Sequence, residues 1–171
     1  IVGPRLNAAG RLDDMSLGIE CLLTDSESLA LDMARELDAL NRDRKAIERD
    51  MQQQALKTLE SMQLDETALP FGLCLYDPEW HQGVIGILAS RLKDRFHRPV
   101  IAFADAGDGM VKGSARSVNG LHIRDALDAV AARHPELISK FGGHAMAAGL
   151  SLREADFPAF AAAFDAEVRR Q

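Results

Sequence analysis

The chain has 171 residues, of which 47% are hydrophobic and 27% charged, as in ordinary folded globular proteins. Its net charge of −6 excludes a uniformly basic nucleic-acid-binding surface, although lysines and arginines can still gather in one groove. No apolar run approaches the roughly 20 residues of a membrane span. Cys21 and Cys74 have no Cys-x-x-Cys or zinc-ligand spacing. We therefore expect a cytoplasmic protein without membrane association.

A long amphipathic helix is predicted in the first half of the chain. Between Leu29 and Leu59, apolar residues recur three or four positions apart, and no Gly or Pro interrupts the pattern before Pro70. Thr24 and Glu27 have the spacing of a capping box. A helix over 26–63 would be roughly 57 Å long, more than a compact domain needs, which predicts that it connects two bodies. The alternative is a helical hairpin broken near Asn41.

After Pro70 the sequence is typical of a compact α/β domain, because short apolar runs alternate with turn residues. The predicted order is β-α-β-β-α-β-α, with a mixed sheet flanked by helices. We expect strands over 71–76, 99–104, 110–117 and 145–152, and helices over 84–96, 123–133 and 157–168.

Two segments have residues suited to phosphate binding. Gly142-Gly143-His144 is predicted to form a loop between a helix and a strand, and its exposed amide groups could cradle an anion, with His144 as a donor. Alternation on the predicted strand 110–117 sends Lys112, Ser114 and Arg116 to one face, where hydroxyl and guanidinium groups suit a phosphate. A tight turn and a solvent-facing strand edge explain the two patterns equally well.

Weaker signals lie elsewhere in the chain. His81-Gln-Gly-Val-Ile-Gly86 opens a predicted helix whose N-terminus favours an anion, although close packing and a capping role for His81 are the simpler account. The N-terminal segment 3–11 suits phosphate contacts or a disordered chain end. The basic run 91–98 is typical of a solvated helix end. The histidines are dispersed, and Asp13-Asp14 is better explained as a helix start than as a metal site.

Taken together, five motifs in register resemble the RecJ family of single-strand-specific 5′ to 3′ DNA exonucleases, in the DHH phosphoesterase superfamily. They are Gly3-Pro-Arg-Leu-Asn-Ala-Ala-Gly-Arg-Leu12, Leu40-Asn-Arg-Asp-Arg-Lys45, His81-Gln-Gly-Val-Ile-Gly-Ile-Leu-Ala-Ser-Arg91, Lys112-Gly-Ser-Ala-Arg-Ser117 and Phe141-Gly-Gly-His-Ala-Met-Ala-Ala-Gly149. The resemblance covers essentially the whole chain. It implies a parent enzyme whose catalytic domain holds two Mn²⁺ or Mg²⁺ ions, and the Ile at position 1 fits a piece of a longer protein.

The resemblance also implies an organisation and a role. Residues 1–25 would be the tail of the catalytic DHH domain, 26–69 the interdomain helix and linker, and 70–171 the DHH-associated, substrate-binding domain. We expect this portion to bind single-stranded DNA for repair and recombination, to hold no metal, and to be inactive as a nuclease alone. Single-strand-binding protein and a RecQ-type helicase are the expected partners.

Site residues are implied position by position. Ser114 and Arg116 resemble ligands of a terminal phosphate, while Gly142, Gly143 and His144 would line the scissile region, with His144 as the candidate catalytic contact. Further phosphate or groove contacts are expected from Arg5, Asn7, Arg11 and Arg44. Two alternatives remain open: a phosphodiesterase of the same superfamily acting on oligonucleotides or cyclic dinucleotides, and a non-catalytic nucleic-acid-binding module like that of alanyl-tRNA synthetases.

Overall fold

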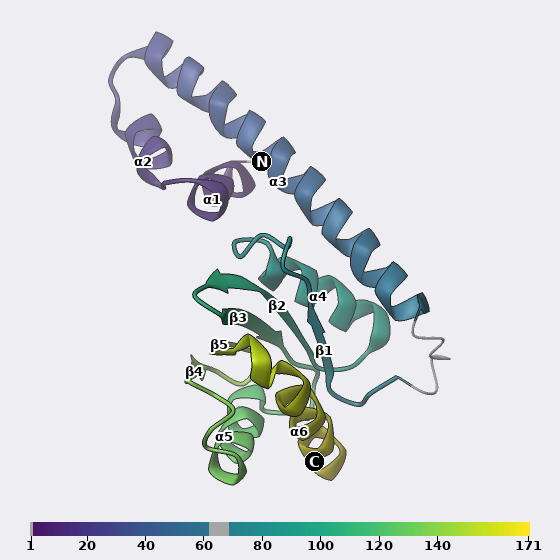
Figure 1. Cartoon of the computed structure of the whole chain (residues 1–171). Coiled ribbons are helices and arrows are strands. Elements are labelled where there is room, and N and C mark those ends of the chain that lie inside the picture. The colour runs from purple at the N-terminus through teal and green to yellow at the C-terminus, as the bar shows by residue number, and fades with distance from the viewer. Residues whose placement is uncertain (1, 62–68) are drawn as a thin grey trace. The chain divides into compact units, whose positions relative to one another are not determined.

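The computed structural model describes residues 2–61 and 69–171. These residues form two compact units, Ile1–Asp50 and Met51–Gln171, here called the N-terminal and the C-terminal unit. Helix α3 contributes residues to both units (Figure 1).

The described part of the N-terminal unit consists of helices and the short segments that connect them. Helix α1 spans Gly3–Leu12, with Pro4 in its first turn, where a missing N–H costs nothing. Helix α2 spans Ser16–Leu23, and the carboxylate of Asp14 accepts hydrogen bonds from the backbone N and the Oγ of Ser16, at 3.1 and 2.8 Å. The prediction that Asp13-Asp14 precedes a helix is therefore confirmed, and the alternative of a disordered chain end is wrong.

Helix α3 is a single element, Glu27–Ser61, so the predicted long helix is confirmed and the alternative of a hairpin broken near Asn41 is wrong. The expected capping box is replaced by a different arrangement. Thr24 Oγ1 accepts from the N–H of Ser26, and Ser26 Oγ accepts from the N–H of Leu29. The predicted last residues of the helix, 62 and 63, lie outside the described residues. Arg5 of α1 forms a salt bridge of 2.6 Å with Asp38 of α3.

The C-terminal unit is built on a mixed five-stranded sheet of order β1-β2-β3-β5-β4, as the sequence predicted for the fold class (Figure 1). Strand β1 runs parallel to β2, and the other neighbouring pairs are antiparallel. The strands span Leu73–Tyr76 (β1), Val100–Gly107 (β2), Met110–Arg116 (β3), Lys140–Gly143 (β4) and Ala147–Arg153 (β5).

Helices cover the two faces of this sheet unequally. Helices α5 (Ile123–Arg133) and α6 (Phe157–Arg170, after the 3₁₀ turn Glu154–Asp156) pack on one face (Figure 1). Helix α4 (Ile85–Phe96) packs on the other face, against β2 and β3. Because α4 contacts β2 and β3 rather than β4 and β5, the second face is covered over only part of its width.

The core between the sheet and α5/α6 is rich in phenylalanine. Phe103, Phe160 and Phe164 are fully buried, and the rings of Phe160 and Phe164 stack with centroids 6.1 Å apart. Burying each such side chain contributes about 1.5–3 kcal/mol to folding. The phenylalanines of α6 thus lie on the face that anchors this helix to the sheet.

One strand was not predicted. Residues 140–143 were expected in a turn, but they form the edge strand β4, paired with β5 through Gly142 and Gly149. A local sequence pattern assigns two adjacent glycines to a turn, because glycine has no side chain that favours an extended backbone. Only the long-range pairing with β5 makes the segment extended.

Candidate phosphate-binding site

Every second residue of β3, β5 and β4 points to the sheet face that carries α4, and the strand register aligns these residues in rows. Lys112, Ser151 and Lys140 form one row, because Ser151 pairs with both lysines. The next row contains Ser114, Gly149 and Gly142, and the third pairs Arg116 with Ala147. We call these eight residues the open face. None of them is acidic, although the whole chain carries a net charge of −6.

The N-terminal turn of α4 lies over one end of the open face. A Cβ built on Gly86 would be 2.9 Å from Arg116 Nη2 and 3.0 Å from Ser114 Oγ, so only glycine leaves room for both groups. A helix N-terminus favours negative charge, because its first N–H groups and the helix dipole point toward a bound anion. The structure thus brings together two of the predicted motifs, the helix opening at Gly83–Gly86 and the Lys112–Ser117 segment.

Arg116 is held in place by its own strand. Its Nη1 donates to Ser114 Oγ at 3.1 Å and to the carbonyl oxygen of Ala115 at 2.8 Å. These bonds use one of the nitrogens of a planar group whose five N–H donors suit bidentate phosphate recognition. Ser114 and Arg116, predicted as a pair, are therefore within hydrogen-bonding distance of each other.

In the middle of the open face, Gly142 and Gly149 leave the backbone uncovered by side chains. We call these two residues the glycine floor. A Cβ on Gly142 would meet nothing within 4 Å, and one on Gly149 would meet only the carbonyl oxygen of Gly113, at 3.9 Å. A hollow of about 410 Å³ lies here, lined by Lys112, Lys140, Phe141, Gly142, Gly149, Leu150 and Ser151. A bare backbone floor beside cationic side chains allows the sugar-phosphate chain of a ligand to approach closely.

The turn between β4 and β5 is fixed by backbone contacts. Gly143 has a φ of 150°, and a Cβ there would lie 2.4 Å from the Cα of Ala148, so no other residue fits without distortion. The N–H of His144 donates to the carbonyl oxygen of Ala147 at 2.8 Å. Further along the turn, the carbonyl oxygens of Ala145 and Met146 accept from the N–H groups of Ile123 and Ser117. The side chain of His144 is exposed beside this rigid turn.

Two other predicted features have structural roles. His81 Nδ1 accepts from the N–H of Gly83 at 3.0 Å, within the turn that precedes α4, while Val84, the N-cap residue of that helix, has no side-chain cap. In the basic run 91–98, Arg98 donates to the carbonyl oxygens of Leu69 and Pro70, and Lys93 forms an ion pair with Asp94. The contacts of Arg98 attach the C-terminal end of α4 to the segment that precedes β1.

Four predicted contacts lie in the N-terminal unit. Arg5 is paired with Asp38, while Asn7 and Arg11 are exposed on α1. Arg44 bonds along its own helix, to Glu48 at 3.1 Å and to Asn41 at 3.2 Å, and its side chain is only 13% exposed. Their roles as phosphate contacts remain predictions.

Four residues of the open face were not among the predicted site residues: Lys112, Lys140, Gly149 and Ser151. Their proximity depends on the pairing of β3, β5 and β4, which joins open-face residues up to 39 positions apart, as for Lys112 and Ser151. The alternation of Lys112 with Ser114 and Arg116 was the only local signal. Gly86 was recognised as a packing glycine, but not as the residue that packs against Arg116.

The part of the chain that the structure describes has no group of three or more His, Cys, Asp or Glu side chains that could hold a metal ion. The described residues therefore offer no donor set that fits the Mn²⁺ or Mg²⁺ ions of the resemblance. In the same residues, no helix is both long and apolar enough to span a bilayer.

A mixed five-stranded sheet, with two helices on one face and one helix over part of the other, makes the C-terminal unit an α/β domain. The family model of the DHHA1 domain matches residues 70–170, and the chain belongs to this family.

Curated relatives extend the similarity into the N-terminal unit. The single-stranded-DNA-specific exonuclease RecJ of Salmonella typhimurium is 62% identical over 159 residues, which are 93% of this chain and 28% of that protein. RecJ of Escherichia coli is 61% identical over the same shares, and RecJ of Bacillus subtilis is 36% identical over 92% of this chain. The chain thus spans little more than a quarter of the first two relatives.

Solved structures agree with these similarities. RecJ of Thermus thermophilus in complex with Mg²⁺ matches with a TM-score of 0.86 and 35% identity, over 99% of this chain and 25% of that one. An exonuclease RecJ bound to manganese matches with a TM-score of 0.81 and 37% identity, over 98% of this chain and 40% of that one.

Proposed function

We propose that this chain is the single-stranded-DNA-binding portion of a RecJ-type 5′ to 3′ exonuclease that acts in DNA repair and recombination. The observation that carries the proposal is the convergence of Arg116 and Ser114 beneath the N-terminus of α4, next to a glycine floor. That arrangement offers hydroxyl, guanidinium and backbone groups to a phosphate and leaves room for the strand that bears it. Identities of 61–62% to two single-stranded-DNA-specific exonucleases support single-stranded DNA as the proposed substrate.

In this proposal the chain positions DNA and another part of the parent protein supplies the chemistry. Positioning alone contributes to rate, because it removes the entropic cost of bringing the scissile bond to the reactive groups. Arg116 and Ser114 bind a terminal or near-terminal phosphate, and Gly142 and Gly143 admit the backbone of the strand. His144 contacts the scissile phosphate. Arg5, Asn7, Arg11 and Arg44 are proposed as further contacts of the N-terminal unit.

Metal ions enter the proposal only through the parent enzyme. The similar RecJ structures were solved with Mg²⁺ or Mn²⁺. We infer that the parent of this chain uses one of these ions on residues outside the chain. Single-strand-binding protein and a RecQ-type helicase are the proposed protein partners, and the cytoplasm is the proposed location.

The division of labour is tested with the purified 171-residue chain. Incubated with Mn²⁺ and a 5′-phosphorylated single strand, it should release no nucleotides, whereas the parent protein should digest the same strand. Robust cleavage by the chain, abolished by a metal chelator, would overturn the division of labour.

The role of the site is tested with Arg116→Ala in the parent protein. The variant should lose substrate binding by about 10- to 100-fold, because a charge-assisted hydrogen bond to phosphate contributes about 1.5–3 kcal/mol. Arg124→Ala is the matched control, since Arg124 is exposed on α5 at the opposite face of the sheet. Metal binding should stay unchanged in both variants. Equal substrate binding by the two variants would remove Arg116 from the site.

A further inference from the structure

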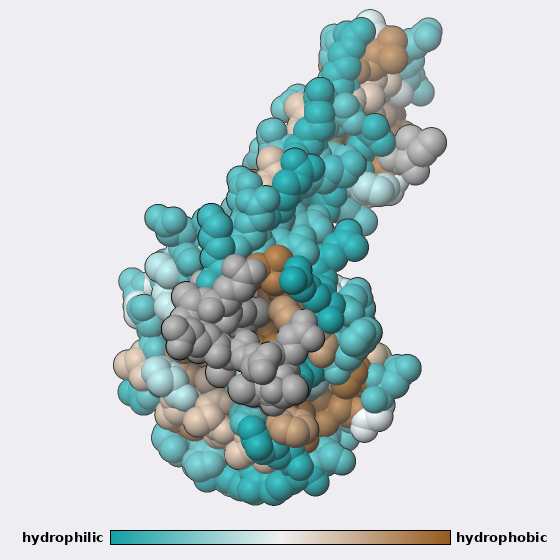
Figure 2. Space-filling model, turned by 90° about the vertical axis from the view of Figure 1, so that its right-hand side faces the viewer, coloured by the Kyte–Doolittle hydropathy of each residue, from teal (hydrophilic) through white to brown (hydrophobic). Residues whose placement is uncertain are grey.

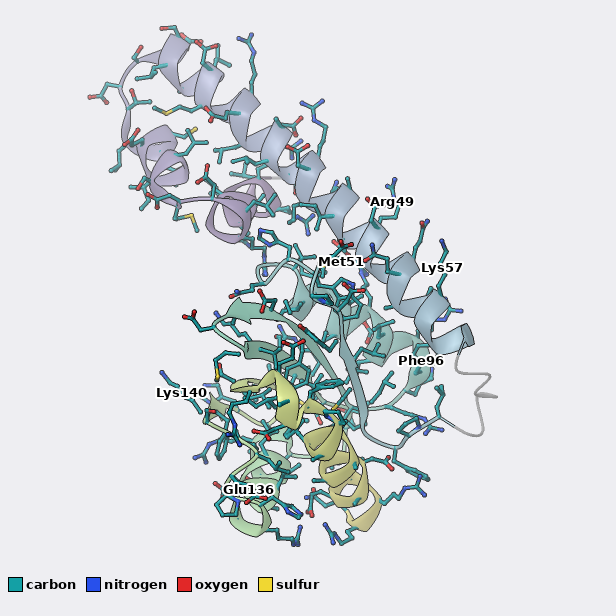
Figure 3. All side chains as sticks on the ribbon, viewed as in Figure 1. Arg49, Met51, Lys57, Phe96, Glu136 and Lys140 are labelled. Atoms are coloured by element: carbon teal, nitrogen blue, oxygen red, sulfur yellow. The ribbon has the colours of Figure 1, made fainter. Side chains whose placement is uncertain are left out.

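The row Lys112, Ser151 and Lys140 lies at the end of the open face away from Arg116. Ser151 pairs directly with both lysines, so the two ammonium groups extend from strands on either side of one hydroxyl. Lys112 and Lys140 are exposed, and Figure 3 shows Lys140 at the β4 edge of the sheet. In the described part of the chain, neither lysine takes part in an ion pair.

This row lies too far from the Ser114–Arg116 pair for a single phosphate to contact both. Lys112 and Arg116 are four positions apart along β3, which corresponds to ~13 Å at the ordinary rise of a strand. One phosphate cannot contact both ends of such a span. The glycine floor of Gly142 and Gly149 lies between them, and the hollow of about 410 Å³ includes both lysines and both glycines.

We propose that Lys112, Ser151 and Lys140 form a second phosphate site, which binds the same DNA strand further along than the phosphate held by Ser114 and Arg116. This inference rests on the proposed function and adds a direction to it. The strand follows the floor of the open face, parallel to β3 and β5, from the α4 end toward the two lysines. Neither lysine contacts the phosphate at Arg116, so together they select for ligand length.

The charge pattern supports a polyanion over a single small anion. Cationic groups stand at both ends of the open face, and the row between them contains only Ser114, Gly149 and Gly142. A chain of phosphates satisfies both ends, whereas inorganic phosphate or a mononucleotide satisfies one. The middle row has no large side chains, so it also leaves room for sugar and base groups. Inorganic phosphate would not need this space.

The test compares Lys112→Gln/Lys140→Gln with Lys45→Gln/Lys57→Gln in the 171-residue chain. The control removes the same charge from exposed positions of α3, where Lys57 is labelled in Figure 3. Backbone NMR shifts of Gly142 and Gly149 are followed during titration with a 5′-phosphorylated dinucleotide, tetranucleotide and octanucleotide of thymidine. All four substituted side chains are exposed, so melting curves should confirm that both variants fold.

Lys112→Gln/Lys140→Gln should bind the dinucleotide as the wild type does and the octanucleotide on the order of tenfold more weakly, with the control unaffected. The slope of log affinity against log salt for the octanucleotide should flatten by about 0.7 for each phosphate that the variant no longer neutralises. Lys112→Arg/Lys140→Arg should restore binding. Equal weakening at every length, or equal weakening in the control, would overturn the second site.

The proposed function is tested independently, by measuring the binding of Arg116→Ala in the same titrations. Loss of binding at all lengths in Arg116→Ala, with no effect of the lysine variant, would leave the proposed function standing and overturn only the second site. If the wild-type chain binds none of the oligonucleotides at millimolar concentration, both proposals fail.

Discussion

Gly86 of α4 lies against the guanidinium group of Arg116, so close that a Cβ on Gly86 would stand 2.9 Å from Arg116 Nη2. Substitution here should therefore separate the integrity of the site from the stability of the fold. The atoms in the way are the far ends of flexible side chains, which can move aside. Alanine also favours the helix over glycine by up to about 1 kcal/mol.

Gly86→Ala should accordingly leave the melting temperature nearly unchanged or slightly raised, while oligonucleotide binding falls severalfold because Arg116 and Ser114 are displaced. Thermal denaturation and binding isotherms measure the two effects. Gly113→Ala is the contrasting variant, since its Cβ would lie 2.6 Å from the buried ring of Phe103 and 2.7 Å from Leu150. That variant should lose about 1–3 kcal/mol of stability. Normal binding by Gly86→Ala would show that Arg116 adapts without loss.

Gly149→Val should block the glycine floor without harming the fold. Its Cβ would meet only the Gly113 carbonyl oxygen, at 3.9 Å, and valine favours a strand. We expect unchanged or higher stability together with a loss of oligonucleotide binding of at least tenfold, because the branched side chain occupies the space of the ligand backbone. Calorimetry and a binding titration check both. Full binding by a stable Gly149→Val would exclude the floor from the path of the strand.

Gly143→Ala should act through the stability of the β4–β5 turn. There the Cβ would collide with the backbone of Ala148 at 2.4 Å, at a φ of 150° that side chains rarely adopt. We expect a loss of about 1–3 kcal/mol from the strained turn, whether or not ligand is present.

Glu167 should make the C-terminal unit sensitive to acid. Burial raises the pKa of this carboxyl group, but hydrogen bonds from Gln171, Arg133 and Arg170 outweigh burial and lower the pKa below 4.5. Because the folded-state pKa is depressed, the stabilisation is complete above about pH 4.5 and is lost as the pH falls through the folded-state pKa.

Glu167→Gln should therefore cost about 1–2 kcal/mol at pH 7, through loss of the charge-assisted bonds, and should flatten the dependence of unfolding free energy on pH below 4.5. Urea denaturation between pH 3 and pH 7, buffered at intervals of roughly one unit, measures both effects. Glu136→Gln is the control, since Glu136 is exposed (Figure 3). An acid transition that stays the same in Glu167→Gln would assign the pH dependence to other carboxylates.

The sequence predicted elements whose signal is local. The 35 residues of α3 follow from apolar spacing alone, and α5 begins and ends where its pattern does, at Ile123 and Arg133. Strand β4 was missed because Gly142 and Gly143 have no side chains that express a strand preference. The pairing of Ser114 with Arg116 follows from alternation within one strand. Lys140 and Ser151 lie on the same sheet face as Ser114 and Arg116 because of the register of three strands. A local sequence pattern does not contain this register.

Apolar surface in the N-terminal unit was likewise not predicted. Leu22, Leu23 and Leu29 are between 47% and 75% exposed. Figure 2 shows hydrophobic residues at the end of the unit where α3 begins, on an otherwise hydrophilic surface. The periodicity of α2 and α3 indicates helices but does not reveal what their apolar residues contact.

The register of β4 and β5 also limits how this part of the chain can change in length. Successive residues of a strand point to opposite faces, so inserting a single residue in β5 before Gly149 would turn Gly149 and Ser151 toward the core and Leu150 toward solvent. We expect related chains to tolerate insertions within these two strands only in pairs, or at a bulge that restores the phase. The β4–β5 hairpin should therefore tolerate substitutions at its surface positions, but not the insertion or deletion of a single residue within a strand.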